Sequence, residues 1–437
     1  MPDTVQALAL PVDWTVARND STVSTQRSFP TWLERLLLLV GSPLLFVLVA
    51  ELAIFALDIE TDVARNDNAQ IAVPVWLLAD EAWVAERQAD LQAGSNEPMA
   101  AADLAWMYYF EEARWIQYRM KPSVDVRVVN PFNKIEVEKA VDFRLHSNSA
   151  GFRGEEIRPK RPDVTRIVTI GDSSTFGWGA EPEHTFQHML ENKLNDELAG
   201  RYEIINLGIP GQNSRHGLGM LRHYALPLEP DLLLVSYGSN DPRVTPTPTD
   251  ELLAADDTWV GGLRFRMLRW RGYRLLRRLL FTLRNPLSVD SENPQLIRTA
   301  PAVPVDDYRE NMMEIVLTAQ EASIRTMLMS VCTGVEVYVA NINNVAKWTD
   351  TPIVNVGVLF KEHRDALIDG TLYPEKVAHY RSMYGRRVLR RQPQYYVTND
   401  GCHPNWVGHS LIADEMLPLV GEALGVTPGG LNPGDSP

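Results

Sequence analysis

The stretch that most constrains the fold is the run RIVTI at residues 166–170, which leads directly into Gly171-Asp172-Ser173-Ser174. A β-branched run that ends in glycine and small polar residues predicts a buried parallel strand, a tight turn and a helix. Such a turn lies at the carboxyl end of a sheet, where open α/β folds build their sites. Glycine and serine are also ordinary turn residues, and the tetrapeptide by itself more often marks a plain connection.

Three later segments also place polar residues where a strand ends or a helix begins. The sequence NLGIPGQN at residues 206–213 follows a strand-like run, and so does YGSND at residues 237–241. The sequence NDGCHPN at residues 399–405 opens an amphipathic helix. The alternation of strands and helices after residue 165 predicts a parallel sheet with helices on both faces. The expected helices cover residues 182–198, 213–225, 307–322 and 405–424.

Together the four segments resemble the blocks of the SGNH/GDSL hydrolase family, which run GDS, a glycine turn, GxND and DxxH in this order. The resemblance covers residues 143–424. Within the family, the chain is similar in its organisation to membrane-anchored bacterial members. It implies a three-layer α/β/α domain of the flavodoxin-like type and a serine ester hydrolase activity. It also implies catalytic or oxyanion-hole roles for a set of five residues, namely Ser173, Gly211, Asn240, Asp400 and His403.

The chemistry of these residue types agrees with those roles. The hydroxyl of Ser173 needs a general base, which His403 can supply while Asp400, three residues earlier, orients the imidazole. The N–H groups of Ser173 and Gly211 and the side-chain amide of Asn240 can then form an oxyanion hole. We expect no cofactor, and no metal site either, because the scattered His and Cys residues lack ligand spacing.

Some of these positions also fit plainer roles. Ser174 is an alternative nucleophile, although the GDS register favours Ser173. Gly211 also fits an ordinary turn glycine. We expect Asp172 and Asp241 to cap the elements that follow them, and the remaining histidines to pack or to lie at the surface.

The composition of the chain limits the kinds of partner that we expect. The chain of 437 residues has room for one catalytic domain with additions. Its net charge of −14 argues against nucleic acid as the main partner. Cys332 and Cys402 are the two cysteines, so a multi-disulfide framework is excluded, and whether these two pair stays open.

The N-terminal region predicts a membrane anchor. Residues 36–57 are almost wholly apolar, interrupted by Pro43 and Glu51, and about 20 helical residues span a membrane. Arginines precede this run and acidic residues follow it, so we expect a single pass through the inner membrane with residues 1–35 in the cytoplasm and the remainder in the periplasm. A buried core helix is the alternative. Glu51 is costly in lipid and hints at a membrane-protein partner.

The remaining segments complete the expected domain organisation. Residues 58–142 form a juxtamembrane addition with helices over 74–92 and 99–119 and strands near 124–129 and 135–145. The hydrolase-like domain covers residues 143–426 with an insertion at 242–305. The Pro- and Gly-rich residues 427–437 are expected to be a disordered tail.

An arginine-rich segment within the insertion has three interpretations. Residues 263–284 contain eight arginines interleaved with apolar and aromatic residues. The segment can rest on anionic lipid headgroups, cover the active site as a lid, or form an ordinary helix pair with solvated arginines.

Three functions therefore remain open. The first is a membrane-anchored periplasmic esterase that deacylates O-acyl esters on a glycan or a lipid. The second is an O-acyltransferase acting on envelope glycans, which shares the first half-reaction. The third is a non-catalytic subunit of a membrane complex.

Overall fold

The computed structural model describes residues 35, 37–56, 108–130, 142–244, 249–284, 300–332 and 335–426. The chain divides into two compact units, residues 1–59 and 60–437, and the catalytic residues expected from the sequence all lie in the second.

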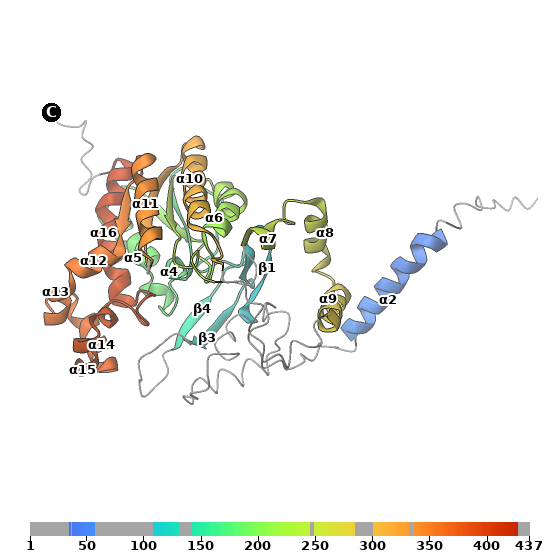
Figure 1. Cartoon of the computed structure of the whole chain (residues 1–437), viewed down its shortest axis with the longest axis horizontal. Coiled ribbons are helices and arrows are strands. Elements are labelled where there is room, and N and C mark those ends of the chain that lie inside the picture. The colour runs from blue at the N-terminus through green and yellow to red at the C-terminus, as the bar shows by residue number, and fades with distance from the viewer. Residues whose placement is uncertain are drawn as a thin grey trace, which may run out of the picture. The chain divides into compact units, whose positions relative to one another are not determined.

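The second unit is built on a five-stranded parallel sheet (Figure 1). The strand order is β6-β5-β7-β8-β9, and every neighbouring pair is parallel. Numbered along the chain this order is 2-1-3-4-5, which is the flavodoxin-like arrangement and confirms the predicted fold class. The strands are β5 (Thr165–Gly171), β6 (Tyr202–Asn206), β7 (Leu232–Ser236), β8 (Arg325–Ser330) and β9 (Ile353–Asn355).

Helices cover both faces of the sheet because alternate strand residues point to opposite sides. Val168 and Val235 pack in one core cluster together with the helices α6 (Ser214–Met220), α10 (Val305–Glu321) and α11 (Glu336–Trp348). Ile167 and Leu234 pack in a second cluster with α5 (Phe186–Glu197) and α16 (Trp406–Leu424). The expected helices over 182–198, 213–225, 307–322 and 405–424 are thereby confirmed.

Short helices fill the region before the C-terminal loop. A third apolar cluster joins them to α16. They are α12 (Val356–Glu362), α13 (Arg364–Asp369), α14 (Pro374–Tyr384), α15 (Arg386–Arg391) and the 3-10 turn η8 (Pro393–Tyr396). Other short turns flank the sheet helices, namely η4 (Pro182–His184), η5 (Leu221–Ala225) and η6 (Leu226–Leu228).

Two antiparallel hairpins precede the sheet. The first pairs β1 (Phe110–Ala113) with β2 (Gln117–Met120), and the second pairs β3 (Asp125–Val129) with β4 (Asp142–His146). The second hairpin agrees with the expected strands, although residues 131–141 lie outside the described residues.

The helix expected over residues 99–119 is wrong from residue 110 onward, where the first hairpin lies. Its aromatic residues fit a helical spacing, but they are also strong strand formers, and the Phe110 and Tyr118 rings meet edge to face across the hairpin instead. Trp115 and Gln117 take positive φ angles at the turn, which a helix does not allow. The helix expected over residues 74–92 lies outside the described residues.

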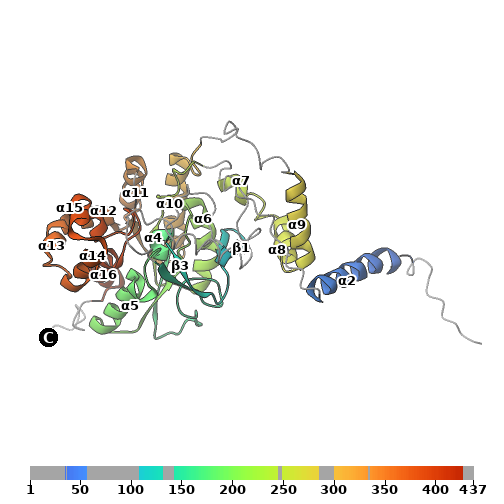
Figure 2. The ribbon, with the colours of Figure 1, turned by 90° about the horizontal axis from the view of Figure 1, so that it is seen from below.

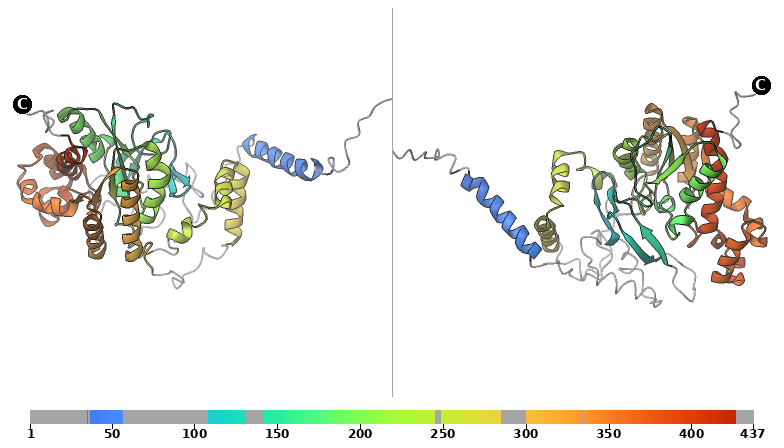
Figure 3. Two further views of the ribbon diagram at one scale, coloured as in Figure 1. Left: turned by 90° about the horizontal axis from the view of Figure 1, so that it is seen from above. Right: turned by 180° about the vertical axis from the view of Figure 1, so that it is seen from behind.

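The insertion after β7 contains three helices, α7 (Thr249–Leu253), α8 (Trp259–Met267) and α9 (Arg271–Arg284). Figures 2 and 3 show α8 and α9 beside the β1–β2 hairpin and away from the sheet. Two side-chain contacts fix this placement: Arg114 Nε donates to the Asp256 carbonyl, and Arg277 pairs with Glu112.

In the first unit, a π-helical turn η1 (Leu37–Gly41) leads into α2 (Ser42–Ala56). None of the helices in the described part of the chain is long and apolar enough to cross a membrane. The crossing expected over residues 36–57 stays a prediction. Residues 427–437 lie outside the described residues.

Candidate active site

The turn after β5 presents Ser173 at the start of the short helix α4 (Ser173–Phe176). Gly171 is required there because a Cβ atom would lie 2.6 Å from the Ser236 carbonyl oxygen. Asp172 caps α4, as expected, by accepting a hydrogen bond from the Ser174 N–H at 2.8 Å. The turn therefore exposes the Ser173 side chain while the neighbouring carboxylate is used for structure.

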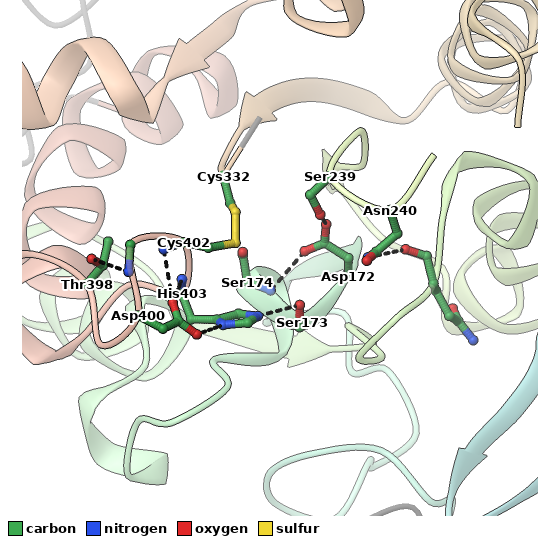
Figure 4. The surroundings of a disulfide bond; sticks show 12 residues. Asp172, Ser173, Ser174, Ser239, Asn240, Cys332, Thr398, Asp400, Cys402 and His403 are labelled. Carbon is green, nitrogen blue, oxygen red and sulfur yellow. Dashed lines mark hydrogen bonds and ion pairs between the residues drawn. A yellow bond between two sulfur atoms is a disulfide. The ribbon is translucent and has the colours of Figure 1, made fainter. Parts of the chain in front are cut away.

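Three of the sequence-predicted residues form a continuous chain of hydrogen bonds (Figure 4). Ser173 Oγ lies 2.8 Å from His403 Nε2, and His403 Nδ1 lies 2.5 Å from Asp400 Oδ2. Asp400 Oδ1 accepts two further bonds, from the N–H groups of Cys402 and His403. The structure thus brings residues 173, 400 and 403 together across a sequence separation of 230 residues.

The electrostatics of Asp400 suit a carboxylate that stays ionised. Its burial acts to raise the pKa, but the hydrogen bonds from the His403 side chain and from two backbone N–H groups outweigh burial and hold the pKa below its usual value. An ionised Asp400 fixes the tautomer of His403 in which Nδ1 carries the proton and Nε2 is free to accept one.

Ser174 occupies a different environment from Ser173. Its hydroxyl is buried and has no hydrogen-bond partner in the part of the chain that the structure describes. Because His403 contacts the Ser173 hydroxyl, the geometry favours Ser173 over the alternative nucleophile.

A disulfide and a helix cap hold the loop that carries Asp400 and His403 in place. A disulfide between Cys402 and Cys332 joins the loop to the segment after β8, with the two Cα atoms 4.8 Å apart. Asn405 then caps α16 by accepting a hydrogen bond from the Gly408 N–H. The question of cysteine pairing, left open by the sequence, is answered by this bond.

The expected oxyanion-hole residues Ser173, Gly211 and Asn240 lie on the turns that follow β5, β6 and β7. Gly211 has a φ angle of +80°, which glycine adopts without strain. The Asn240 side-chain amide donates to the Gln212 carbonyl at 2.9 Å, which uses one of its two amide hydrogens. Among the described residues, the N–H groups of Ser173 and Gly211 have no acceptor. Donors that a developing oxyanion needs are therefore available on these turns.

The structure adds supporting residues that the sequence did not reveal. Tyr118 of β2 donates its hydroxyl hydrogen bond to the Pro210 carbonyl at 2.6 Å, immediately before Gly211. Gln212 Nε2 donates in turn to the carbonyls of Ile116 and Tyr118. The β1–β2 hairpin thus braces the glycine turn from outside the sheet. A local sequence signal for this role is lacking, because the contact spans 92 residues.

Asp241 follows Asn240, and its hydrogen bonds go to the start of the earlier helix α6, whose N-cap is Asn213, rather than to the element that follows it as expected. Its Oδ1 accepts hydrogen bonds from the N–H and the hydroxyl of Ser214, whereas its Oδ2 is buried without a partner in the described residues. Burial, assisted by the nearby Asp172 charge, raises the pKa of Asp241 to about 7.

Two of the remaining histidines pack in the core, as expected. His409 Nδ1 accepts from the Phe186 N–H, and burial lowers its pKa to about 3. His216 completes a capping box with Asn213 at the start of α6. Among the described residues, no group of His, Cys, Asp and Glu side chains is arranged to hold a metal ion.

One comparison with known proteins identifies a family. The model of the GDSL-like lipase/acylhydrolase family matches residues 169–411, which contain all five of the sequence-predicted site residues. Among curated proteins, none matches this chain.

Solved structures give similarities at low sequence identity. An esterase from Pseudoalteromonas sp. is 17% identical, with 60% of this chain and 98% of that chain covered and a TM-score of 0.34. A lipase/acylhydrolase from Enterococcus faecalis is 15% identical, with 61% and 100% covered and a TM-score of 0.35. A catalytic mutant of an acetylxylan esterase from Geobacillus stearothermophilus is 15% identical, with 59% and 94% covered and a TM-score of 0.34.

The buried Asp241 makes stability depend on pH. Its pKa is raised from about 4 in an unfolded chain to about 7 in the folded protein, so the folded state holds the proton more tightly. The free energy of unfolding should therefore fall as the pH rises from about 4 to about 7. The contribution of Asp241 to this free energy should be constant above about pH 7. In Asp241→Asn the fall should be smaller, as measured by urea unfolding at several pH values. The exposed Asp163→Asn is the control, and an identical pH profile for Asp241→Asn and wild type would contradict the assignment.

The hairpin contact predicts a positioning role for Tyr118. In Tyr118→Phe the Pro210 carbonyl loses its donor and the Gly211 turn loosens, so kcat should fall about tenfold with KM nearly unchanged. Steady-state ester hydrolysis measures both. Tyr202→Phe is a matched control, because the Tyr202 hydroxyl also donates to a backbone carbonyl, that of Ala199, away from the site. Equal losses of kcat in both variants would mean that Tyr118 contributes only to stability.

Proposed function

Because the chain belongs to the GDSL-like lipase/acylhydrolase family, we propose that it is a serine esterase that hydrolyses O-acyl esters through an acyl-enzyme on Ser173. The observation that carries this proposal is the unbroken line of hydrogen bonds from Ser173 through His403 to Asp400. A nucleophile, a base within reach and a carboxylate that orients the base are the parts that acyl transfer requires.

The first half-reaction follows from this geometry. As Ser173 Oγ attacks the ester carbonyl carbon, His403 Nε2 accepts the hydroxyl proton, and the ionised Asp400 stabilises the resulting imidazolium. The carbonyl oxygen becomes an oxyanion that accepts hydrogen bonds from the N–H groups of Ser173 and Gly211 and from the remaining amide hydrogen of Asn240. His403 then donates its proton to the departing alcohol oxygen, and the acyl group stays on Ser173.

The second half-reaction repeats these steps with water. His403 removes a proton from the water molecule that attacks the acyl carbon, and it returns the proton to Ser173 Oγ as the acid leaves. A sugar hydroxyl in place of water gives O-acyl transfer by the same steps. We favour hydrolysis, because the family whose model matches the chain is one of lipases and acylhydrolases.

We propose a substrate and a location together. The substrate is a small O-acyl ester, such as an acetyl group on an envelope glycan or on a lipid-linked sugar. The enzyme is held at the periplasmic side of the inner membrane by residues 36–57. In support, arginines precede this run and acidic residues follow it, and the Cys332–Cys402 disulfide suits an oxidising compartment. The helix α2 within the run also exposes large apolar side chains, among them Leu44, Leu45, Phe46 and Leu52.

The catalytic proposal predicts how the variants rank. In the full chain, Ser173→Ala or His403→Ala should lower kcat for p-nitrophenyl acetate by about 10⁴-fold or more. Asn240→Ala should lower kcat by about 10²–10³-fold and leave a measurable rate, since one of three donors is lost. Ser174→Ala is the matched control and should retain activity, because its hydroxyl does not contact His403.

Two results would contradict this assignment. Full activity in Ser173→Ala would exclude it as nucleophile. A wild-type protein that is folded but inactive on acetyl and butyryl esters, and remains inactive when a sugar acceptor is added, would favour the non-catalytic subunit.

The location predicts a topology. A full chain carrying alkaline phosphatase at its C-terminus should give phosphatase activity in bacteria and stay with membranes through carbonate extraction, and deletion of residues 36–57 should abolish both. A green fluorescent protein fusion is the control, because it fluoresces in the cytoplasm. A fluorescent fusion without phosphatase activity would overturn the periplasmic placement.

A further inference from the structure

A surface on the insertion combines exposed tryptophans with exposed arginines. We define the Trp–Arg face as Trp259, Leu263, Arg266, Arg269 and Trp270, on α8 and the turn that follows it. Trp259 is 79% exposed, Leu263 47% and Trp270 46%. Large side chains of this kind rarely stand together in water without a partner.

Helix geometry explains why these side chains gather. Residues 259, 263 and 266 recur at intervals of four and three, so they lie on one side of α8. The opposite side is occupied by Gly261, which is buried and packs so closely that a Cβ atom would lie 2.1 Å from the Ala255 carbonyl oxygen. The helix is therefore held in one rotation about its axis, and that rotation turns the tryptophan outward.

The arginines of this segment divide into two groups. Arg264 pairs with the buried Asp256 within the insertion, and Arg277 pairs with Glu112 of the hairpin and so holds the insertion to the domain. Arg266, Arg269 and Arg274 are exposed and form no ion pair with any described residue.

The contacts of the segment also argue against a lid. Those that hold residues 256–277 to the remainder of the domain involve Glu112, Arg114 and Trp115, all on the β1–β2 hairpin. Within the described residues, none of them reaches Ser173, Asp400 or His403.

We propose that the Trp–Arg face, extended by Arg274, binds the surface of a membrane that contains anionic phospholipids. Indole rings prefer the headgroup region because they are amphipathic, and guanidinium groups bind lipid phosphates. The leucine and tryptophan side chains supply apolar area that enters the interface, and the arginines supply selectivity for negative charge. The proposal is independent of the esterase activity and concerns a surface separate from the catalytic residues.

A site-specific label tests this contact in the full chain. Trp259→Cys is labelled with the fluorophore NBD, and the disulfide keeps Cys332 and Cys402 from reacting. Trp348→Cys on α11 is the matched control, because Trp348 is also exposed, at 57%. The proteins are reconstituted in phosphatidylcholine vesicles with or without phosphatidylglycerol, each carrying a nitroxide quencher at the headgroup level. Quenching at position 259 should exceed that at position 348 by about twofold or more, and most in the anionic vesicles.

A charge variant separates the contribution of the arginines. Replacing Arg266, Arg269 and Arg274 with Gln should remove the preference for phosphatidylglycerol, with the far-ultraviolet circular dichroism spectrum unchanged. Quenching at position 259 no greater than at position 348 would overturn the proposal. Equal quenching in neutral and anionic vesicles would overturn its electrostatic part. Because the readout is fluorescence, an inactive esterase would not alter any of these outcomes.

Discussion

The active site depends on the buried carboxyl group of Asp172, which joins the turns after two neighbouring strands. One of its oxygens accepts from the Ser174 N–H and starts the helix that carries Ser173, while the other accepts from the hydroxyl of Ser239. Because β5 and β7 pair in parallel with Gly171 opposite Ser236, these turns already lie side by side. The Asp172 bonds then fix Ser173 and Asn240 relative to one another. Burial raises the pKa of Asp172, and the hydrogen bonds from Ser239 and Ser174 offset this effect only in part.

His403 lies on a separate loop, and contacts with three other parts of the structure hold this loop in position. The disulfide joins Cys402 to the segment after β8, Asn405 begins α16, and the Asn399 side chain donates to the Gly179 carbonyl beside the nucleophile helix. Asp400 also accepts hydrogen bonds from the N–H groups of Cys402 and His403 in its own loop, so the carboxylate and the imidazole move as one unit. Such redundancy keeps the imidazole within hydrogen-bond distance of a serine that lies on another part of the sheet.

The sequence was informative where structure is local. Each sheet strand from β5 to β8 is an apolar run that ends in turn residues, and the order of these runs predicted both the parallel sheet and the edge at which Ser173, Asn240 and His403 meet. The β1–β2 hairpin was not predictable in this way. Its conformation depends on positive φ angles at Trp115 and Gln117 and on distant partners, and aromatic spacing alone fits a helix as well. The arginines and aromatic residues of the Trp–Arg face stood out in the composition of the sequence. The structure was needed to tell the exposed arginines from those that form ion pairs.

Residues that precede the family match also hold the turns of the candidate site in place. Arg153, which follows β4, is fully buried, and its guanidinium donates to the carbonyls of Phe176, Gly177 and Ala180 just after the nucleophile helix. Burial lowers its pKa to about 10, so the group is still charged at neutral pH and compensates the carbonyl dipoles at the end of that helix. The family match starts at residue 169, after both Arg153 and the Tyr118 brace. These contacts support the turns that carry Ser173 and Gly211, so residues outside the family match also contribute to the site.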